Sequence, residues 1–372
     1  MNNVEFLTES FKKYYFDNIN SIHVLPDSSK REFGYQKFGS GMIRHLEVKN
    51  DNDLRVFLMQ NNPADVYCSN AYYSFPTADM KDKDFQGADL IFDIDAKDLN
   101  LPCRRQHTCA ICQDCKHVYQ DELVCTECKS AKSSTISIAC KDCICAAKDE
   151  TRKLLNLLHN DLGIDRKDIQ VYFSGNEGFH VHAYDVSYKK MESKERGDLV
   201  DYIMFRGFTP DSFGFKKSNP KKSNFPDPGE KDWSERVAKY LFSSKKEKSK
   251  ISKQLIKDGY NSLQKKFDYL THEIGIKIDA NVTSDIHRIF RFPNSLNSKS
   301  GLVKSRCDDL INFDPYKDAC LINDDKVSVR ANCPISFKLN GKTFGPYKQQ
   351  IIDIPRYAAV YLICKDLGTI NN

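Results

Sequence analysis

Nine of the fourteen cysteines in this 372-residue chain lie between Cys103 and Cys145, and this cluster constrains the fold more than any other feature. The first residues have neither the basic nor the apolar segment of a secretory signal, so a disulfide framework is not expected. Three Cys-x-x-Cys pairs and an overlapping fourth instead have the spacing of tetrahedral zinc ligands. We therefore predict a zinc-binding module over residues 103–145 that holds one or two zinc ions. Its candidate ligands are Cys103, His107, Cys109, Cys112, Cys115, Cys125, Cys128, Cys140 and Cys143.

Within the module, the spacing from Cys112 to Cys128 predicts a short ribbon whose hairpin tip is residues 117–120. A second site would be closed by Cys103, by His107 or Cys109, and by Cys140 and Cys143. A redox role would need a thioredoxin-like context, which the sequence lacks. The five cysteines outside the cluster are predicted to be small core residues: Cys68, Cys307, Cys320, Cys333 and Cys364.

The rest of the chain has the composition of a folded soluble protein, with 40% apolar and 29% charged residues. No apolar run reaches the ~18 residues that a membrane span requires, so no membrane partner is expected. Helical spacing predicts helices over residues 4–19 and 148–162, and β-rich apolar runs predict strands over 88–95, 169–173 and 179–184. Interleaved helices and strands indicate an α/β or α+β fold.

Charge is concentrated in one segment of the chain. Residues 216–266 contain fifteen Lys and Arg against six Asp and Glu, a net charge of +9 within a total of +5. This segment is either a polyanion contact or a solvated helical face. If it binds DNA, charge reversal at Lys245, Lys246 and Lys248 should weaken binding and flatten its salt dependence.

An Asp-x-Asp pair ends the first predicted strand. Alternation along the strand places Asp93 and Asp95 on one face, after the apolar residues Leu90, Ile91 and Phe92. Two buried carboxylates on one face are costly unless a cation neutralises them, and Mg²⁺ or Mn²⁺ prefers such oxygen ligands. Two-metal phosphoryl transfer normally needs a third acid. Asp279 is a possible third ligand.

Two further segments have the residue types that bind phosphate. The turn from Ser174 to His180 contains two glycines, which allow close backbone approach, and His180 and His182 share one strand face. An ordinary glycine-containing hairpin would have the same pattern. The segment 279–302 supplies three cations that suit a phosphate, namely Arg288, Arg291 and Lys299.

Together, these three segments resemble the catalytic (small) subunit of archaeal and eukaryotic replicative primases, most closely the archaeal form. The likeness includes residues 31–35, 42–45, 71–73 and 313–315 and covers roughly four-fifths of the chain. It implies a mixed α/β primase fold. Residues 1–102, 146–189 and 267–372 would form the catalytic body, residues 190–266 a small basic helical lobe, and residues 103–145 an inserted zinc-binding module.

The resemblance also implies roles for individual residues. Asp93, Asp95 and Asp279 would hold two Mg²⁺ or Mn²⁺ ions at the reacting phosphate. The triphosphate of the nucleotide would be bound by Ser174, His180, Arg291 and Lys299, and Glu32 and Arg44 would lie near the nucleotide and primer site. Two positions depart from the family pattern: Glu177 stands where a basic residue is usual, and Asn297 where a histidine is usual. Both departures predict weaker triphosphate binding.

The family implies template-directed synthesis of short RNA primers, with DNA primers as a further product, and it implies three kinds of partner. These are a large primase subunit with an iron–sulfur domain, a single-stranded DNA template, and NTPs or dNTPs as substrates. The protein would be cytoplasmic and nucleoid-associated if archaeal, and nuclear if eukaryotic. One alternative is a primase-like polymerase that extends existing ends in repair or plasmid replication. Another is a non-catalytic zinc-ribbon subunit that binds nucleic acid.

Overall fold

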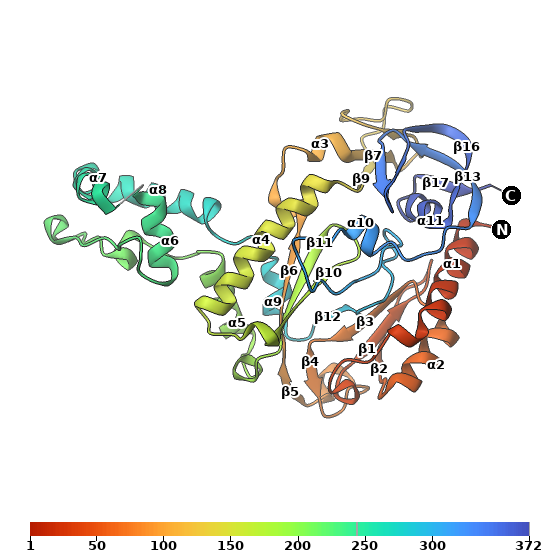
Figure 1. Ribbon diagram of the computed structural model, residues 1–372, viewed down its shortest axis with the longest axis horizontal. Helices are drawn as coiled ribbons and strands as arrows, with labels where there is room; N and C mark the ends of the chain where they lie inside the picture. Colours follow the sequence, from red (N-terminus) through yellow and green to blue (C-terminus); the bar gives the residue numbers. More distant parts are fainter. Residues whose placement is uncertain (243–244, 372) are drawn as a thin grey trace.

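Two antiparallel sheets form the centre of the molecule in the computed structural model, which describes residues 1–242 and 245–371 (Figure 1). The first sheet has the order β10-β11-β6. In β6, Leu90, Phe92 and Ile94 are buried in the main core, while Asp93 and Asp95 lie on the opposite face, as strand alternation requires. The strands are β6 (Leu90–Asp95), β10 (Ile169–Phe173) and β11 (Gly178–Ala183).

One helix covers each face of this sheet. The core face packs against α4 (Lys141–Asn160), whose Leu154, Leu157 and Leu158 are fully buried. The other face contacts α9 (Ala280–Ser284), where the Thr283 hydroxyl donates to the Ile91 carbonyl at 2.9 Å. Asp279, which precedes α9, is therefore brought beside β6.

The second sheet has the order β12-β3-β1-β2 and packs beside helices α1 and α2. Its strand β12 comes from more than 200 residues further along the chain than β3, and the pairing sets Arg291 opposite Tyr67. The elements are α1 (Asn3–Asp17), β1 (Phe33–Gln36), β2 (Met42–Leu46), α2 (Asp51–Asn61), β3 (Asp65–Ser69) and β12 (Ile289–Arg291).

Smaller sheets complete the body, and the two ends of the chain meet there. The Ile370 amide donates to the Asn3 side chain at 2.9 Å. The sheet β16-β13-β17 packs around α11 near these ends (Figure 1). The elements are β4 (Ala71–Tyr73), β5 (Phe85–Ala88), α10 (Pro315–Asp318), β13 (Lys326–Cys333), β14 (Phe337–Leu339), β15 (Lys342–Phe344), β16 (Tyr347–Pro355), α11 (Arg356–Cys364) and β17 (Gly368–Ile370).

The cysteine-rich segment forms a three-stranded sheet of its own, in the order β8-β7-β9. Two tyrosine hydroxyls fix it to the body: Tyr361 accepts from the Ala139 amide at 2.7 Å and Tyr316 from the Cys140 amide at 3.1 Å. The predicted hairpin tip at 117–120 is wrong, because Val118 and Tyr119 pair with β7 as strand β8. The elements are α3 (Arg104–His107), β7 (Thr108–Cys112), β8 (Val118–Tyr119) and β9 (Ser133–Ser137).

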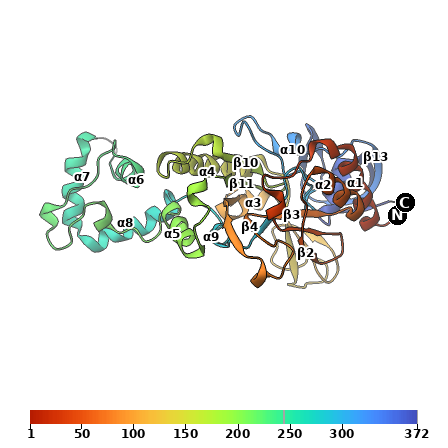
Figure 2. The same cartoon turned by 90° about the horizontal axis from the view of Figure 1, so that it is seen from below.

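A helical arm projects from the body on the side away from the chain ends (Figures 1 and 2). Packed aromatic side chains form its interior, with Phe205 in contact with Phe208, Trp233 and Phe267. At its base, the buried Arg196 donates to the carbonyls of Ala88 and Asp89 in the body. The helices are α5 (Ser193–Ile203), α6 (Asp232–Leu241), α7 (Lys245–Asp258) and α8 (Tyr260–Glu273).

The predicted mixed α/β fold is confirmed, and so are the five helices and strands expected from periodicity. The second predicted helix begins at Lys141 rather than at residue 148, so α4 starts inside the cysteine-rich segment. In the part of the chain that the structure describes, no helix is both long and apolar enough to cross a bilayer.

Candidate active site and metal centres

A cavity of about 480 Å³ lies between the two central sheets. Six of the nine residues expected to act in catalysis or nucleotide binding line it, although they come from three distant parts of the sequence. Strands β6 and β11 are neighbours in one sheet and β12 belongs to the other, so their polar side chains reach the cavity from its two sides. The six are Asp93, Asp95, Ser174, His180, Arg291 and Lys299.

The three predicted acids are held together by main-chain contacts. The Asp279 amide donates to the Asp93 carbonyl at 2.9 Å, which places the third acid beside the Asp-x-Asp strand. Burial and the neighbouring carboxylates of Asp95 and Asp279 raise the pKa of Asp93 to about 8. Burial is the larger cause of this shift, because it disfavours the charged form, and the negative charges of Asp95 and Asp279 add to it.

One carboxylate oxygen in this group lacks a hydrogen bond. Asp93 Oδ1 is buried without a hydrogen-bonding partner among the described residues, and His180 Nε2 lies 3.5 Å from it. A buried, unsatisfied carboxylate oxygen is costly. A divalent cation would satisfy it, and the all-oxygen donor set of three carboxylates suits Mg²⁺ or Mn²⁺.

The turn between β10 and β11 depends on its glycines. A Cβ at Gly178 would lie 2.3 Å from the Ile94 carbonyl oxygen, so only glycine lets this turn approach β6. Gly175 has a φ of +87° and would press a Cβ against the Asn297 side chain at 2.9 Å. The turn is closed by the Ser174 amide, which donates to the Gly178 carbonyl at 2.9 Å. The close contact with β6 is what brings Ser174 into the cavity.

Three cations face the cavity with different partners. Arg291 is bound to the buried carboxylate of Asp65 and also donates to the Leu296 carbonyl at 2.9 Å. In contrast, the side chains of Arg288 and Lys299 have no hydrogen bond or ion pair within residues 1–242 and 245–371. Arg288 and Lys299 are therefore the cations available to an anionic ligand, and Arg291 is largely engaged by the protein.

The two histidines of β11 differ in position. His180 lines the cavity, and burial together with the positive charges of Lys304, Arg291 and Arg288 holds its pKa well below the usual range. It is therefore neutral and offers one N–H. His182 does not reach the cavity: its Nε2 lies 3.1 Å from the buried Lys304 ammonium. The expectation that both histidines face a phosphate is wrong for His182.

Glu32 and Arg44 lie outside the cavity lining but next to it. Arg44 donates to both oxygens of the fully buried Glu32, at 2.8 and 3.2 Å, and to the His287 carbonyl at 3.3 Å. Lys83 adds a second ion pair to Glu32 at 3.4 Å. Because His287 precedes Arg288, this charged cluster adjoins the Arg288 end of the cavity.

The two departures from the family pattern occupy different environments. Asn297 lines the cavity, where its amide donates to the Ser174 carbonyl at 3.3 Å and its oxygen accepts from the Lys299 amide at 2.9 Å. Asn297 thus joins the turn to the Lys299 loop. Glu177 is buried and is not part of the cavity lining.

The cysteine-rich segment contains two groups of four side chains whose sulfur or nitrogen atoms lie within 4.8 Å of one another. Both groups could hold a metal ion. The Sγ atoms of Cys112 and Cys128 are 3.5 Å apart, as are those of Cys115 and Cys125. Thiols packed this closely around one centre fit a tetrahedral ion such as zinc. One group is Cys103, His107, Cys140 and Cys143, and the other is Cys112, Cys115, Cys125 and Cys128.

Cysteine spacing left open whether His107 or Cys109 belongs to the first group, and the structure shows which of them does. His107, whose Nε2 lies 3.2 Å from Cys143 Sγ, belongs to the first group, whereas Cys109 is buried in the hydrophobic core and belongs to neither. Outside the cluster, Cys68, Cys307, Cys320 and Cys333 are buried as predicted, and Cys364 is partly buried.

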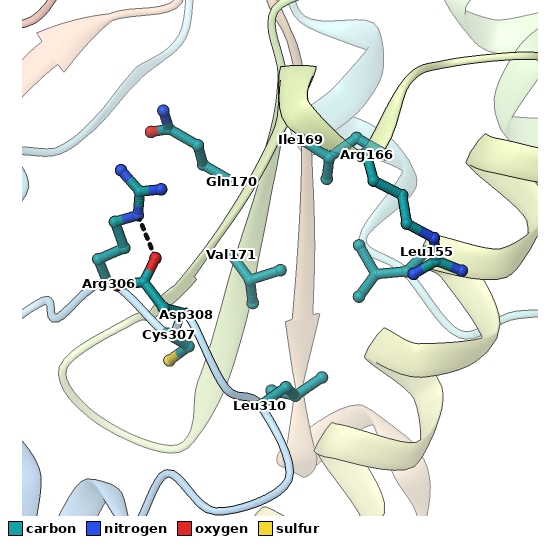
Figure 3. Close-up of a pocket in the computed structure, with 9 residues that line it drawn as sticks. All are labelled: Leu155, Arg166, Ile169, Gln170, Val171, Arg306, Cys307, Asp308 and Leu310. Atoms are coloured by element: carbon teal, nitrogen blue, oxygen red, sulfur yellow. Dashed lines mark hydrogen bonds and ion pairs between the residues drawn. The ribbon is translucent and has the colours of Figure 1, made fainter.

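A second cavity, of about 260 Å³, lies between α4 and β10 and contains none of the predicted site residues (Figure 3). Leu155 and Val171 point into it, and its rim carries the exposed ion pair of Arg306 and Asp308 at 2.7 Å. Its small volume and lack of free charged groups give it no role in the chemistry of the first cavity.

Comparison with known proteins gives consistent matches. A family model described as the DNA primase small subunit matches residues 92–308. The DNA primase small subunit PriS of Nitrosopumilus maritimus (strain SCM1) is 53% identical over 367 residues, which cover 99% of this chain and 98% of that protein. The protein of the same name from Cenarchaeum symbiosum (strain A) is 47% identical and covers 98% and 97%.

A more distant relative and one solved structure extend this comparison. PriS of Archaeoglobus fulgidus is 30% identical over 373 residues, covering 97% of this chain and 96% of that protein. The polymerase domain of ligase D from Mycobacterium tuberculosis, solved in complex with DNA, has a TM-score of 0.39 and 12% identity, and covers 82% of this chain and 83% of that chain. A structural likeness this weak carries no argument.

Proposed function

The chain belongs to the DNA primase small-subunit family and is a primase catalytic subunit, a nucleotidyltransferase; from this premise we propose how its residues act. Asp93, Asp95 and Asp279 form the catalytic centre, at which a nucleotide is joined to a 3′-hydroxyl on a single-stranded DNA template. The observation that carries this assignment is the buried, unsatisfied Asp93 Oδ1 beside two further carboxylates.

Two Mg²⁺ or Mn²⁺ ions at these acids would activate the attacking hydroxyl and stabilise the leaving phosphate oxygen. The protein's own task is to hold the reactants in line. The Asp279 amide donates to the Asp93 carbonyl, so the main chain that carries the third acid is held beside β6. His180, neutral and 3.5 Å from Asp93, can donate an N–H to a phosphate oxygen without adding charge.

The triphosphate would lie along the cavity between the turn and the Lys299 loop. Ser174 and Asn297 offer neutral donors there, while Arg288 and Lys299 supply positive charge that is held in no ion pair within the described residues. Arg291, bound to Asp65, shapes this wall of the cavity and contributes its remaining N–H groups. Glu32 and Arg44 would act next to Arg288, where the nucleotide and primer meet.

Zinc is the metal that best suits the two cysteine-rich groups, because thiolate and imidazole donors at tetrahedral spacing select it. Both sites are closed by four protein ligands, which is typical of structural zinc rather than of a catalytic ion. We assign both sites the task of folding the module, and the site that includes Cys140 and Cys143 the further task of fixing it to α4.

The remaining partners follow from the family. A large primase subunit with an iron–sulfur domain, a single-stranded template and NTPs are the expected partners and substrates, with dNTPs as a second substrate class. The basic arm is the candidate contact for the template or the large subunit, because Lys and Arg displace counterions from phosphates. A non-catalytic zinc-ribbon subunit would not need the carboxylates of Asp93 and Asp95 at such a cavity, and the relatives named as primase small subunits favour a primase over a polymerase that only extends existing ends.

Unprimed synthesis tests the proposal. Purified protein with single-stranded DNA, NTPs and Mn²⁺ or Mg²⁺ should form dinucleotides, whereas an end-extending polymerase would need an added primer. Asp93→Ala or Asp95→Ala should abolish nucleotide addition and retain zinc and the folded state. Asp324→Asn removes an exposed carboxylate outside the cavity and should leave activity unchanged. Wild-type-like synthesis by either Asp→Ala variant would refute the assignment.

A further inference from the structure

Adjacent residues in the turn face opposite sides. Asn176 lines the cavity, whereas Glu177 is buried behind the turn. The Glu177 carboxylate meets two cations there, Arg104 Nη1 at 3.4 Å and Lys365 Nζ at 3.9 Å. These cations come from two elements that are remote in sequence from the turn, α3 and the end of α11. Glu177 is thus the point at which three parts of the chain meet.

Lys365 links this junction to the cavity. Its ammonium is almost fully buried and donates to Asn176 Oδ1 at 2.9 Å. Among the described residues, Glu177 is the one carboxylate within ion-pair distance of Lys365. A buried ammonium needs such a counter-charge, so Glu177 helps to keep Lys365 in the position where it fixes the Asn176 side chain.

Arg104 links the same junction to the first cysteine–histidine group. It lies between Cys103 and His107 in the sequence, and its guanidinium also donates to the Ser137 hydroxyl at 2.7 Å. The helix that bears His107 is therefore tied to the turn through the Arg104–Glu177 pair. A shift of this helix would move the counter-charge of Glu177 and, through Lys365, the Asn176 side chain.

We propose that Glu177 is a positioning residue for nucleotide binding, which holds the turn against Arg104 of the metal-binding module and Lys365 of the C-terminal helix. The proposal rests on the function assigned above and deepens it. The acidic residue at this position is then not simply a lost triphosphate contact. Through its two ion pairs, Glu177 makes the shape of the turn depend on the metal-binding module and on helix α11. The neighbouring Asn176 faces the cavity in which the nucleotide would bind.

A double-mutant cycle tests this role. Glu177→Gln keeps the size of the side chain and removes its charge, and Arg104→Gln removes the charge of its partner. We expect each single variant to raise the KM for the nucleotide about fivefold to tenfold with kcat changed less than twofold, because ground-state positioning is lost. The double variant should be little worse than either single variant, since both break the same pair. Metal content per chain should stay that of the wild type in all three.

Arg105→Gln is the matched control, because Arg105 lies on the same helix, is exposed, and has no side-chain hydrogen bond or ion pair in the described structure. It should leave KM unchanged. An unchanged KM in Glu177→Gln would overturn the proposal, and so would strictly additive effects of the two substitutions or a loss of metal from Glu177→Gln. These outcomes differ from a failure of the proposed function, in which the wild-type protein itself would add no nucleotide.

Discussion

Arg288 and Arg291 lie three residues apart and reach the same cavity, but their surroundings give them different tasks. Arg291 is buried and bound to Asp65, whose carboxylate also accepts from the Ser298 amide at 2.9 Å and from the Ser298 hydroxyl at 2.6 Å. Arg288 has no such partner in the described structure. We therefore expect Arg291 to contribute mainly to the stability of the cavity wall, and Arg288 mainly to the binding of an anionic ligand.

Substitution by glutamine should separate these tasks. Arg288→Gln is expected to raise the KM for the nucleotide about tenfold or more and to leave thermal unfolding nearly unchanged, because a charge-assisted contact to phosphate is lost. Arg291→Gln should lower the free energy of unfolding by about 3 kcal/mol, since Asp65 is left buried without its counter-charge. Steady-state kinetics and denaturant unfolding measure the two effects.

Arg306→Gln is the control for these variants, because Arg306 is an exposed arginine outside the active-site cavity. Arg306→Gln should change neither the KM for the nucleotide nor the free energy of unfolding. Equal effects of Arg288→Gln and Arg291→Gln on KM, with no difference in stability, would contradict the division of tasks.

At this scale the sequence predicts residue types better than their pairings. Alternation is enough to place Asp93 and Asp95 on one face, because both lie in one strand. Alternation cannot show that Asp65 binds the Arg291 side chain, since the two residues are 226 positions apart and meet only when β12 pairs with β3. The same limit explains His182, whose partner Lys304 comes from a loop that no local pattern connects with β11.

Among the elements, the two metal-binding groups differ in their connection to the body. The group of Cys112 and Cys128 belongs to the ribbon alone, with ligands between β7 and the segment before β9. The other group includes Cys140 and Cys143, which cap and begin α4, a helix with fully buried leucines in the main core. Loss of a metal should therefore have different consequences at the two sites.

Serine substitutions test this difference. Cys128→Ser should lose one equivalent of zinc and barely change the Tm of the body, whereas Cys140→Ser should lose one equivalent and lower the Tm by several degrees, because it frees the start of α4. Metal analysis gives the zinc content of each variant, and thermal unfolding gives its Tm. Cys145→Ser, in the same segment but outside both groups, should retain all zinc. Wild-type protein without zinc, or equal losses in Cys145→Ser, would show that the ligand sets are wrong.

Cysteine spacing predicts these elements only in part. It groups seven of the eight candidate ligands as the geometry does, but it cannot decide between His107 and Cys109, of which one side chain lies in the first metal-binding group and the other in the core. Periodicity detects α4 from its leucines, yet its first five residues contain Cys143 and Cys145, which belong by composition to the cysteine-rich segment.

In the whole molecule, the basic arm leads directly into the proposed catalytic centre. Helix α8 ends at Glu273, and six residues later the chain reaches Asp279. This short connection is fixed at Ile276, whose amide donates to the Ile203 carbonyl, and at Lys277, whose amide donates to Glu150. A ligand bound to the arm therefore lies on the element that leads directly into the third acid.

Charge reversal on the arm tests its contact with DNA. Of the lysines first considered, Lys245 and Lys246 have side chains outside the described residues, and Lys248 pairs with Asp227 at 3.0 Å. Lys250, Lys253 and Lys257 are exposed on one face of α7 and are better targets. Their reversal to Glu should weaken binding to single-stranded DNA and reduce the slope of log K against log salt by about 2.

The comparison for this test is a variant with the same change of charge on the body, Lys12, Lys326 and Lys342 to Glu, all three exposed. It should alter the slope much less. If both triple variants behave alike, the effect is one of net charge, and the arm is a solvated helical face.

The most direct test of the central claim counts divalent ions at the three carboxylates. With a bound non-hydrolysable nucleotide, titration of Mn²⁺ followed by electron paramagnetic resonance should give two tightly bound ions per wild-type chain. Asp279→Asn keeps the size of the side chain and should bind fewer than two, with its zinc content and Tm close to those of the wild type. Two tight ions in the variant, or none in the wild-type protein, would contradict the assignment of Asp93, Asp95 and Asp279 as the catalytic centre.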